Sequence, residues 1–145
     1  MKILFIGDSI TDVGRNANNG SMESIGQGYP LIISAKMAKE EPLKHSFINV
    51  GISGNRIVDL YARIKCDVWN NNPDLISILI GVNDVWHESA NNGVEADRFE
   101  TVYRMFIADT LKRLPNVKFI IIVHFLLKNL IFLYNICVRF FGFFF

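Results

Sequence analysis

The chain has 145 residues, with fifteen basic and fourteen acidic side chains and a formal net charge of +1 at pH 7. This length suits one domain with a sizeable core, and the balanced charge without a basic cluster argues against nucleic acid as a partner. Half of the residues are hydrophobic and twelve are Phe. The excess is concentrated in residues 119–145, where only Lys128 and Arg139 carry a full charge.

The two cysteines and the N-terminus carry little specific signal. Cys66 and Cys137 have neither C-x-x-C nor metal-ligand spacing, so no metal is predicted, and a disulfide between them stays open. The first apolar run ends at Asp8, whereas a secretory leader needs about 7–15 apolar residues. The expected compartment is the cytoplasm.

Hydrophobic periodicity predicts strands that alternate with helices. Apolar runs predict strands at 2–6, 46–50, 74–80 and 117–123, and three- and four-residue spacing predicts helices at 29–40, 56–69 and 95–114. The Asn-, Gly- and Ser-rich stretch 15–28 predicts a loop. This alternation predicts an α/β fold with a parallel sheet and right-handed crossovers. Such folds bind ligands at the carboxyl ends of their strands.

Small polar residues follow each of the first three predicted strands. The segments are Gly7 to Thr11, Asn49 to Asn55, and Gly81 to Trp86. Each has a structural interpretation: Asp8 or Ser9 as a helix cap, Gly54 as a turn glycine, and Asn83 closing a turn with its own side chain. Their convergence at one sheet edge favours a functional site.

The residue types at this edge suit acyl transfer. Ser9 would attack an ester carbonyl, and the oxyanion would accept hydrogen bonds from the amides of Ser9 and Gly54 and from the Asn83 side chain. The chain has no G-x-S-x-G segment, which excludes the nucleophile elbow of α/β-hydrolases. This chemistry requires neither a metal nor an organic cofactor.

The three segments resemble the first three motif blocks of the GDSL/SGNH hydrolases, and the resemblance covers residues 1 to about 123. It implies a flavodoxin-like three-layer sandwich, a Ser9 nucleophile, and an oxyanion hole of Ser9, Gly54 and Asn83, with Asp8 and Asp84 in support. Within the family, the chain is most similar to intracellular carbohydrate acetylesterases of the acetylxylan-esterase type. The implied partner is a small acylated substrate, an acetylated carbohydrate, although lipase or thioesterase specificity stays open.

The fourth block of that family, D-x-x-H, does not occur in this sequence, in which the last Asp is Asp109. The resemblance therefore predicts an SGNH domain over 1–127 that is incomplete at its C-terminal end and followed by an aberrant hydrophobic tail at 128–145. Loss of a triad member typically costs about 10⁴–10⁶ in turnover, so the esterase is expected to be crippled. His124, just after the last predicted strand, is the least unfavourable substitute base, ahead of His87 and His45, which are expected on the surface.

Three interpretations of the tail stay open. A frameshift or premature stop would produce such a composition. A membrane span over 119–138 has sufficient length but would contain Lys128 and three other polar residues. A terminal helix, supported by the spacing of apolar residues from Leu127 to Val138, could cover a bare sheet face or mediate homo-oligomerisation. The alternatives to an esterase are accordingly a non-catalytic ligand-binding remnant, a membrane-anchored protein or a misfolded product.

Overall fold

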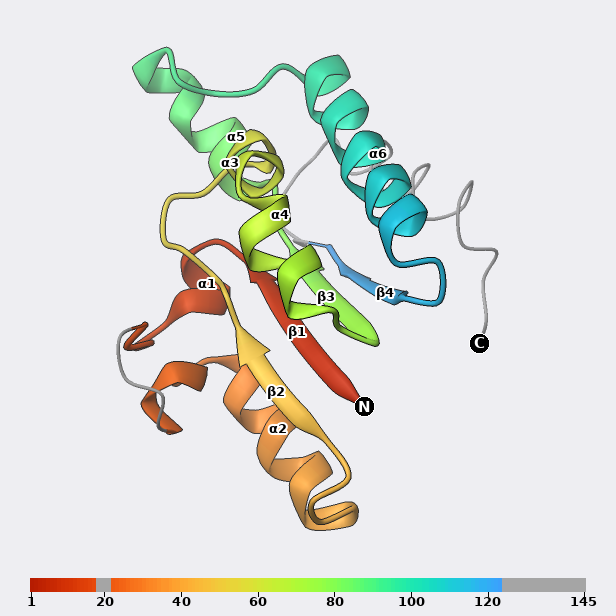
Figure 1. Cartoon of the computed structure of the whole chain (residues 1–145). Coiled ribbons are helices and arrows are strands. Elements are labelled where there is room, and N and C mark those ends of the chain that lie inside the picture. Colours follow the sequence, from red (N-terminus) through yellow and green to blue (C-terminus); the bar gives the residue numbers. More distant parts are fainter. Residues whose placement is uncertain (18–21, 124–145) are drawn as a thin grey trace.

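The computed structural model describes residues 1–17 and 22–123, and its centre is a parallel sheet (Figure 1). The strands are β1 (Lys2–Gly7), β2 (Ser46–Asn49), β3 (Leu75–Leu79) and β4 (Lys118–Ile122), in the order β2-β1-β3-β4. Leu4 in β1 is in register with Ile48 on one side and Ile76 on the other, and Ile76 is in register with Phe119. The predicted α/β fold with a parallel sheet is confirmed.

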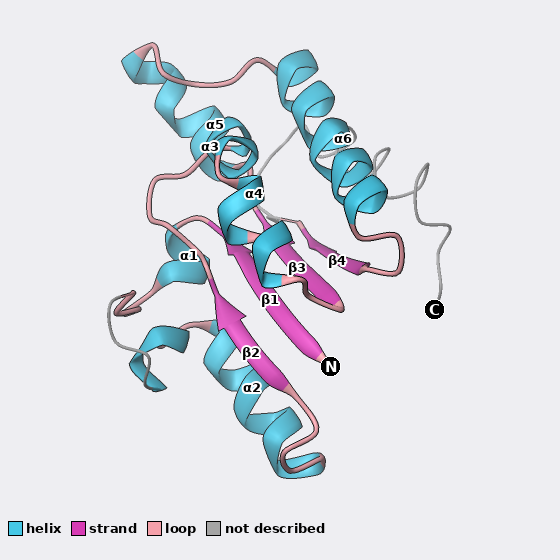
Figure 2. Ribbon diagram, in the orientation of Figure 1, coloured by secondary structure: helices cyan, strands magenta, loops and turns pink. Residues whose placement is uncertain are grey.

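Helices connect the strands (Figure 2). The α-helices are α1 (Ser9–Asp12), α2 (Tyr29–Glu40), α3 (Ile57–Ala62), α4 (Ile64–Asp67), α5 (Val82–Trp86) and α6 (Ala96–Arg113), and the 3₁₀ helices are η1 (Met22–Ile25), η2 (Trp69–Asn71) and η3 (His87–Ala90). The predicted helices at 29–40 and 95–114 are confirmed to within a residue. Apolar periodicity predicted neither α1 nor α5, because helices of four or five residues are too short to show it, although the capping interpretation of Asp8 implied a helix at the position of α1.

The single helix predicted over 56–69 is wrong, because the chain leaves helical geometry at Arg63 (φ −108°, ψ 11°). The Arg63 guanidinium bonds to the end of β2 at the Val50 carbonyl (2.8 Å) and to the Asn55 side chain (2.9 Å). These tertiary contacts leave no trace in the apolar spacing. The predicted loop at 15–28 also contains η1.

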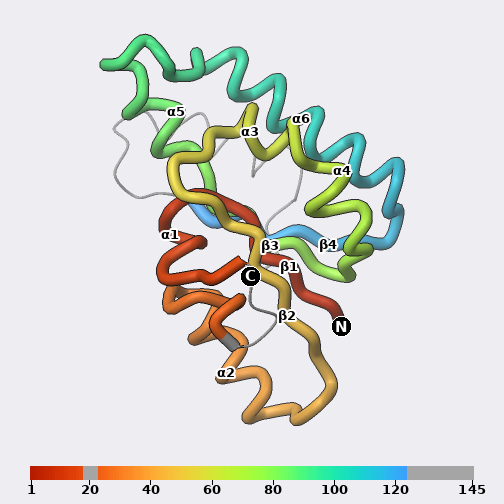
Figure 3. Tube along the Cα trace, turned by 60° about the vertical axis from the view of Figure 1, so that its left-hand side comes forward, coloured from red at the N-terminus to blue at the C-terminus, as the bar shows by residue number. Residues whose placement is uncertain are grey.

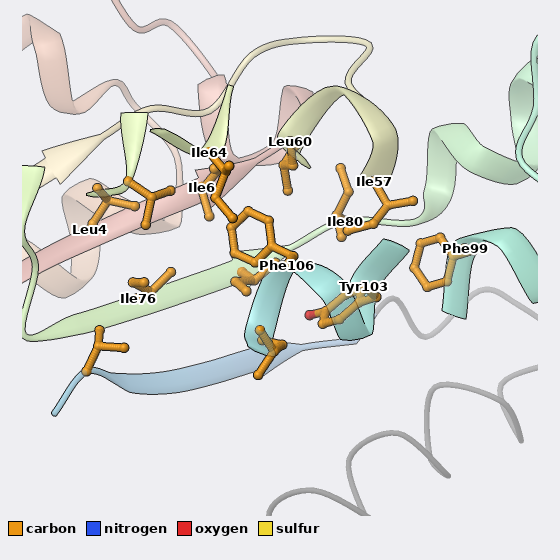
Figure 4. Packing of buried hydrophobic residues seen from close by; sticks show 14 residues of the cluster. Leu4, Ile6, Ile57, Leu60, Ile64, Ile76, Ile80, Phe99, Tyr103 and Phe106 are labelled. Atoms are coloured by element: carbon orange, nitrogen blue, oxygen red, sulfur yellow. The ribbon is translucent and has the colours of Figure 1, made fainter. Parts of the chain in front are cut away.

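Two helical layers enclose the sheet, and Figure 3 shows α2 on one side and α3, α4 and α6 on the other. Leu4 and Ile6 face the larger core, whereas Ile3 and Phe5 face α2, as strand alternation requires. Figure 4 shows Phe106 and Tyr103 of α6 packed with the side chains of α3 and the sheet. The three-layer arrangement that the resemblance implied is therefore present.

The C-terminal predictions fall largely outside the described residues. Residues 119–122 form part of β4, so the first part of the suggested membrane segment is a strand. Throughout 1–17 and 22–123, no helix combines the length and apolar character needed to cross a bilayer. His124, Cys137 and the suggested domain boundary at 127 lie outside the described residues, so the roles predicted for them stay predictions. Cys66 lies within the described residues and is exposed.

Candidate active site

The strands β1, β2 and β3 end at one edge of the sheet, where α1, the segment 50–56 and α5 follow them (Figure 1). Gly7 closes β1 at this edge. A Cβ at Gly7 would collide with the Leu79 carbonyl oxygen and with Thr11 Oγ1. Glycine is thus required here because β1, β3 and α1 approach one another too closely for a side chain.

Asp8 caps α1 and leaves Ser9 exposed. The Asp8 carboxylate accepts a hydrogen bond from the Ile10 amide (3.0 Å), and the residue is fully buried. Ser9 is the first residue of α1 and is accessible to solvent. The capping interpretation of Asp8 is confirmed, and Ser9 is exposed at the first position of the capped helix, at this edge of the sheet.

A buried network of polar side chains connects α1 to α2 and to the end of β2. Thr11 Oγ1 shares a hydrogen bond with the Tyr29 hydroxyl (3.3 Å), and burial raises the pKa of Tyr29. Asn49, at the end of β2, donates to the carbonyls of Thr11 (2.7 Å) and Ile25 (2.8 Å) and accepts from the Gly51 amide (2.9 Å). Asn49 therefore joins the segment after β1 to the segment after β2.

Asp12 holds the same two segments together from the exposed side. Its carboxylate accepts from the Ser53 amide (2.9 Å) and hydroxyl (2.8 Å) and pairs with Arg15 (3.0 Å), which also donates to the Gly51 carbonyl. Burial raises the pKa of Asp12, but the hydrogen bonds from Ser53 and Arg15 outweigh it and leave that pKa below its ordinary value. Asp12, Ser53 and Asn49 were not among the predicted site residues, although Asn49 and Ser53 lie within the motif segment 49–55 and Asp12 directly follows the segment 7–11.

Gly54 follows this clamped segment in a left-handed conformation (φ +82°). No atom lies within 4 Å of the position that a Cβ would occupy. The backbone conformation therefore favours glycine here, and open space surrounds the residue. The turn-glycine interpretation is confirmed, and it is compatible with a ligand approaching the Gly54 backbone.

Asn83 and Asp84 reach the Gly54 segment from α5. Asn83 is 6% exposed, and its side-chain amide donates to the Asn55 carbonyl (3.0 Å) instead of closing its own turn, so that alternative is wrong. Asp84 is 3% exposed and accepts from the Ile57 amide (3.0 Å). Burial raises the pKa of Asp84 to about 6, against the opposing effects of the Ile57 amide and Arg56.

The described histidines lie away from Ser9 in the hydrogen-bond network. His45 precedes β2 at the opposite edge of the sheet and contacts Glu41 (2.8 Å). Its side chain is only 6% exposed, so the expected surface position is wrong. His87 begins η3, directly after α5. Within 1–17 and 22–123, no hydrogen bond joins Ser9 to a histidine, and no group of three His, Cys, Asp or Glu is arranged to hold a metal.

Each of the three motif segments contains an exposed apolar side chain. Ile10 follows Ser9, Ile52 lies two residues before Gly54, and Val85 and Trp86 follow Asn83 and Asp84. All four are substantially exposed, Trp86 at 67%. Exposed apolar residues in this position suit a ligand that is partly apolar.

Together, the parallel three-layer fold and the polar residues at its carboxyl edge define an α/β protein of the class that binds ligands at this edge. The model of the GDSL-like lipase/acylhydrolase family matches residues 5–139. An acetylxylan esterase of Geobacillus stearothermophilus is 39% identical over 130 residues, which are 84% of this chain and 58% of that protein. The chain belongs to the GDSL-like lipase/acylhydrolase family.

Solved structures agree with this assignment. Structures of the Geobacillus esterase superimpose with a TM-score of 0.74 at 39% identity over 84% of this chain and 57% of theirs. A GDSL-like lipase candidate from Parabacteroides merdae gives a TM-score of 0.77 at 37% identity, covering 83% of this chain and 57% of its own. An α/β hydrolase from the Lake Arreo metagenome gives 0.81 at 28% identity, covering 95% and 72%. The chain thus spans under three fifths of the curated relative.

Three structures of the Geobacillus esterase are of catalytic variants, in which a serine, an aspartate or a histidine is replaced by alanine. That esterase therefore uses all three residue types in catalysis. The described part of the present chain shows a serine at the expected edge of the sheet. It shows no Asp-His pair bonded to that serine.

Proposed function

We propose that the chain carries the nucleophile half of a serine esterase site, with Ser9 as nucleophile and with Ser9, Gly54 and Asn83 as oxyanion donors. The observation that carries this proposal is the bonding of three strand-end segments into one unit. Asn49 and Asp12 bind the Ser9 segment to the Gly54 segment, and Asn83 binds the Gly54 segment to α5. Membership of the acylhydrolase family supports ester hydrolysis as the reaction.

In this reaction, Ser9 Oγ would bond to the ester carbonyl carbon and lose its proton to a base. The carbonyl oxygen would become an oxyanion, which accepts from the amides of Ser9 and Gly54 and from Asn83 Nδ2. Asn83 Nδ2 carries two hydrogens, and the Asn55 carbonyl uses one of them. Collapse of this intermediate releases the alcohol, and water then releases the acid from the acyl-enzyme.

The general base that would take the Ser9 proton is the least well supported element of the proposed site. The sequence has no D-x-x-H segment, and we propose His124 as the candidate base that its position after β4 favours. Without an oriented base, turnover falls by about 10⁴–10⁶ relative to an intact triad. The expected activity of this chain is therefore small but dependent on Ser9.

We propose an acetylated carbohydrate as the substrate class. The support is the 39% identity to an acetylxylan esterase and the exposed Trp86 beside the site, since flat aromatic rings pack well against sugar faces. Lipase-type or thioesterase-type specificity is the alternative within the family. A series of acyl esters from acetyl to octanoyl separates the two, because an acetylesterase favours the shortest acyl chain.

The test is hydrolysis of p-nitrophenyl acetate by the purified chain, the Ser9→Ala variant and a matched Ser89→Ala control. Ser89 is also an exposed serine, but it lies in η3 and bonds to the Trp86 carbonyl. The proposal expects a rate above background that Ser9→Ala abolishes and Ser89→Ala retains, and that His124→Ala also reduces. Equal rates for the wild type and Ser9→Ala, in folded protein, would overturn the esterase proposal.

The open space at Gly54 and the second hydrogen of Asn83 Nδ2 are also compatible with a second candidate, a non-catalytic ligand-binding function. In that case an acetylated xylo-oligosaccharide would bind without turnover, and Asn83→Ala would weaken the binding. Isothermal titration of the same preparations distinguishes it from the esterase.

A further inference from the structure

Two consecutive residues of α5 bond to the segment directly after Gly54. Asn83 donates to the Asn55 carbonyl (3.0 Å), and Asp84 accepts from the Ile57 amide (3.0 Å). Gly54 itself has a left-handed backbone and no neighbours around its Cβ position. Both bonds lie on the C-terminal side of Gly54, and they restrict where its amide can lie relative to Asn83.

The burial of Asp84 carries a cost in folding free energy. The residue is 3% exposed, and burying a carboxylate without a direct cationic partner costs free energy. Arg56, the cation that favours the ionised form of Asp84, directs its guanidinium to Asp59 (3.0 Å) and to Asn92 (2.7 and 2.9 Å). The charged groups that act on Asp84 are thus Arg56, which favours its ionised form, and Asp59, which disfavours it.

Capping of α3 does not by itself explain Asp84. Asp59 already forms a capping box with Arg56 at this end of the helix and accepts from the Arg56 amide (2.8 Å). What distinguishes Asp84 from Asp59 is its location on α5, next to Asn83. The bond between Asp84 and the Ile57 amide joins the first residue of α3, three residues after Gly54, to α5, the helix that also carries Asn83.

We propose that Asp84 is a positioning residue, which holds the Gly54 segment against α5 so that the amides of Gly54 and Asn83 converge on one oxyanion. The proposal rests on the oxyanion roles given above for these two residues. Asp12 restrains the same segment on its other side through Ser53. Residues on both sides of Gly54 therefore bond to a carboxylate, Ser53 to Asp12 of α1 and Ile57 to Asp84 of α5.

The first readout is independent of catalysis. Proton–nitrogen NMR spectra of the full chain report the Gly54 backbone amide and the Asn83 side-chain amide. In Asp84→Ala, both signals are expected to shift or broaden together with that of Ile57. Asp59→Ala is the matched control, because it removes a carboxylate from the same helix end without a link to α5. It should disturb Arg56 and leave Gly54 and Asn83 in place.

A second variant keeps the test valid if Asp84→Ala fails to fold. Asp84→Asn preserves the size of the side chain and one acceptor oxygen but cannot ionise. Between pH 5 and 8, the Gly54 and Asn83 signals of the wild type should titrate together. In Asp84→Asn they should not titrate. If both Asp84 substitutions change the Ile57 signal but leave the Gly54 and Asn83 signals unchanged, the proposal is overturned. Asp84 would then act only as a cap of α3.

Kinetics supply the functional readout. For the Ser9-dependent hydrolysis of p-nitrophenyl acetate, Asp84→Ala should lower kcat by about 10²-fold, as misplacement of a donor by about 1 Å does, with little change in KM. Asp84→Asn should recover part of this loss. If no Ser9-dependent hydrolysis exists but the NMR signals respond as expected, the esterase proposal fails and the positioning role of Asp84 stands.

Discussion

The buried carboxyl of Asp84 should make the free energy of unfolding depend on pH in a direction opposite to that of most acidic residues. Burial raises the pKa of Asp84 from 3.8 to about 6 in the folded state. A folded state with the higher pKa binds the proton more tightly than the unfolded chain does. Asp84 therefore contributes stability that is fully present below about pH 3.8 and is lost as the pH rises through about 6.

The two pKa values determine the size of this contribution. At about 1.4 kcal/mol for each pH unit, the difference between 3.8 and about 6 corresponds to about 3 kcal/mol in total. Between pH 8 and pH 5, only the part within about one unit below the folded pKa is gained, which is about 1.4 kcal/mol. The Asp84→Asn variant cannot ionise and lacks this gain. Relative to the wild type, it should thus be about 1.4 kcal/mol more stable at pH 8 than at pH 5.

The assay is urea denaturation of the wild type and Asp84→Asn at pH 5 and pH 8, followed by circular dichroism. Comparing the difference between the two proteins at both pH values cancels the contributions of the histidines. Asp109→Asn is the control, because hydrogen bonds from Tyr61 and Lys112 lower the pKa of Asp109, which therefore does not titrate in this range. A stability difference between the wild type and Asp84→Asn that is the same at both pH values would refute a raised pKa at Asp84.

Three further substitutions test the packing that supports the site, each by the shift of the urea midpoint. Gly7→Ala should destabilise the fold by about 1–3 kcal/mol, because the new Cβ collides with the Leu79 carbonyl, and an unchanged midpoint would contradict the close approach of β1 and β3. Asn49→Ala removes the hydrogen bonds that Asn49 donates to Thr11 and Ile25 and the one that it accepts from Gly51, and it should cost more than about 2 kcal/mol, so a loss below about 0.5 kcal/mol would refute that network. Phe106→Ala empties a fully buried position and should cost about 3–5 kcal/mol, and a smaller loss would mean that the core between α6 and the sheet collapses around it.

The sequence alone predicted the four strands and the helices at 29–40 and 95–114 in their correct order, and it supplied the residues proposed for the site. Runs such as Ile3 to Ile6 and the spacing of Phe99, Val102 and Phe106 are local patterns, because strand and helix periods depend on neighbours within a few residues. The polar residues after each strand could be placed at one edge for the same reason, once the sheet was taken as parallel. The roles of Ser9, Gly54 and Asn83 depend additionally on the resemblance to the acylhydrolase family, and they stay predictions.

Only the tertiary structure decided how these segments hold one another. The strand order β2-β1-β3-β4 places segments side by side that lie far apart in the chain. The bonds of Asn49, Asp12 and Arg63 likewise join distant residues, and those of Arg63 accompany the break in the predicted helix. The 3% exposure of Asp84, the raised pKa that results from this burial, and its bond to the Ile57 amide likewise depend on which segments the tertiary structure brings to α5. Burial and hydrogen-bond partners depend on which distant segments come together, and a local pattern of polar and apolar residues carries no information about that choice.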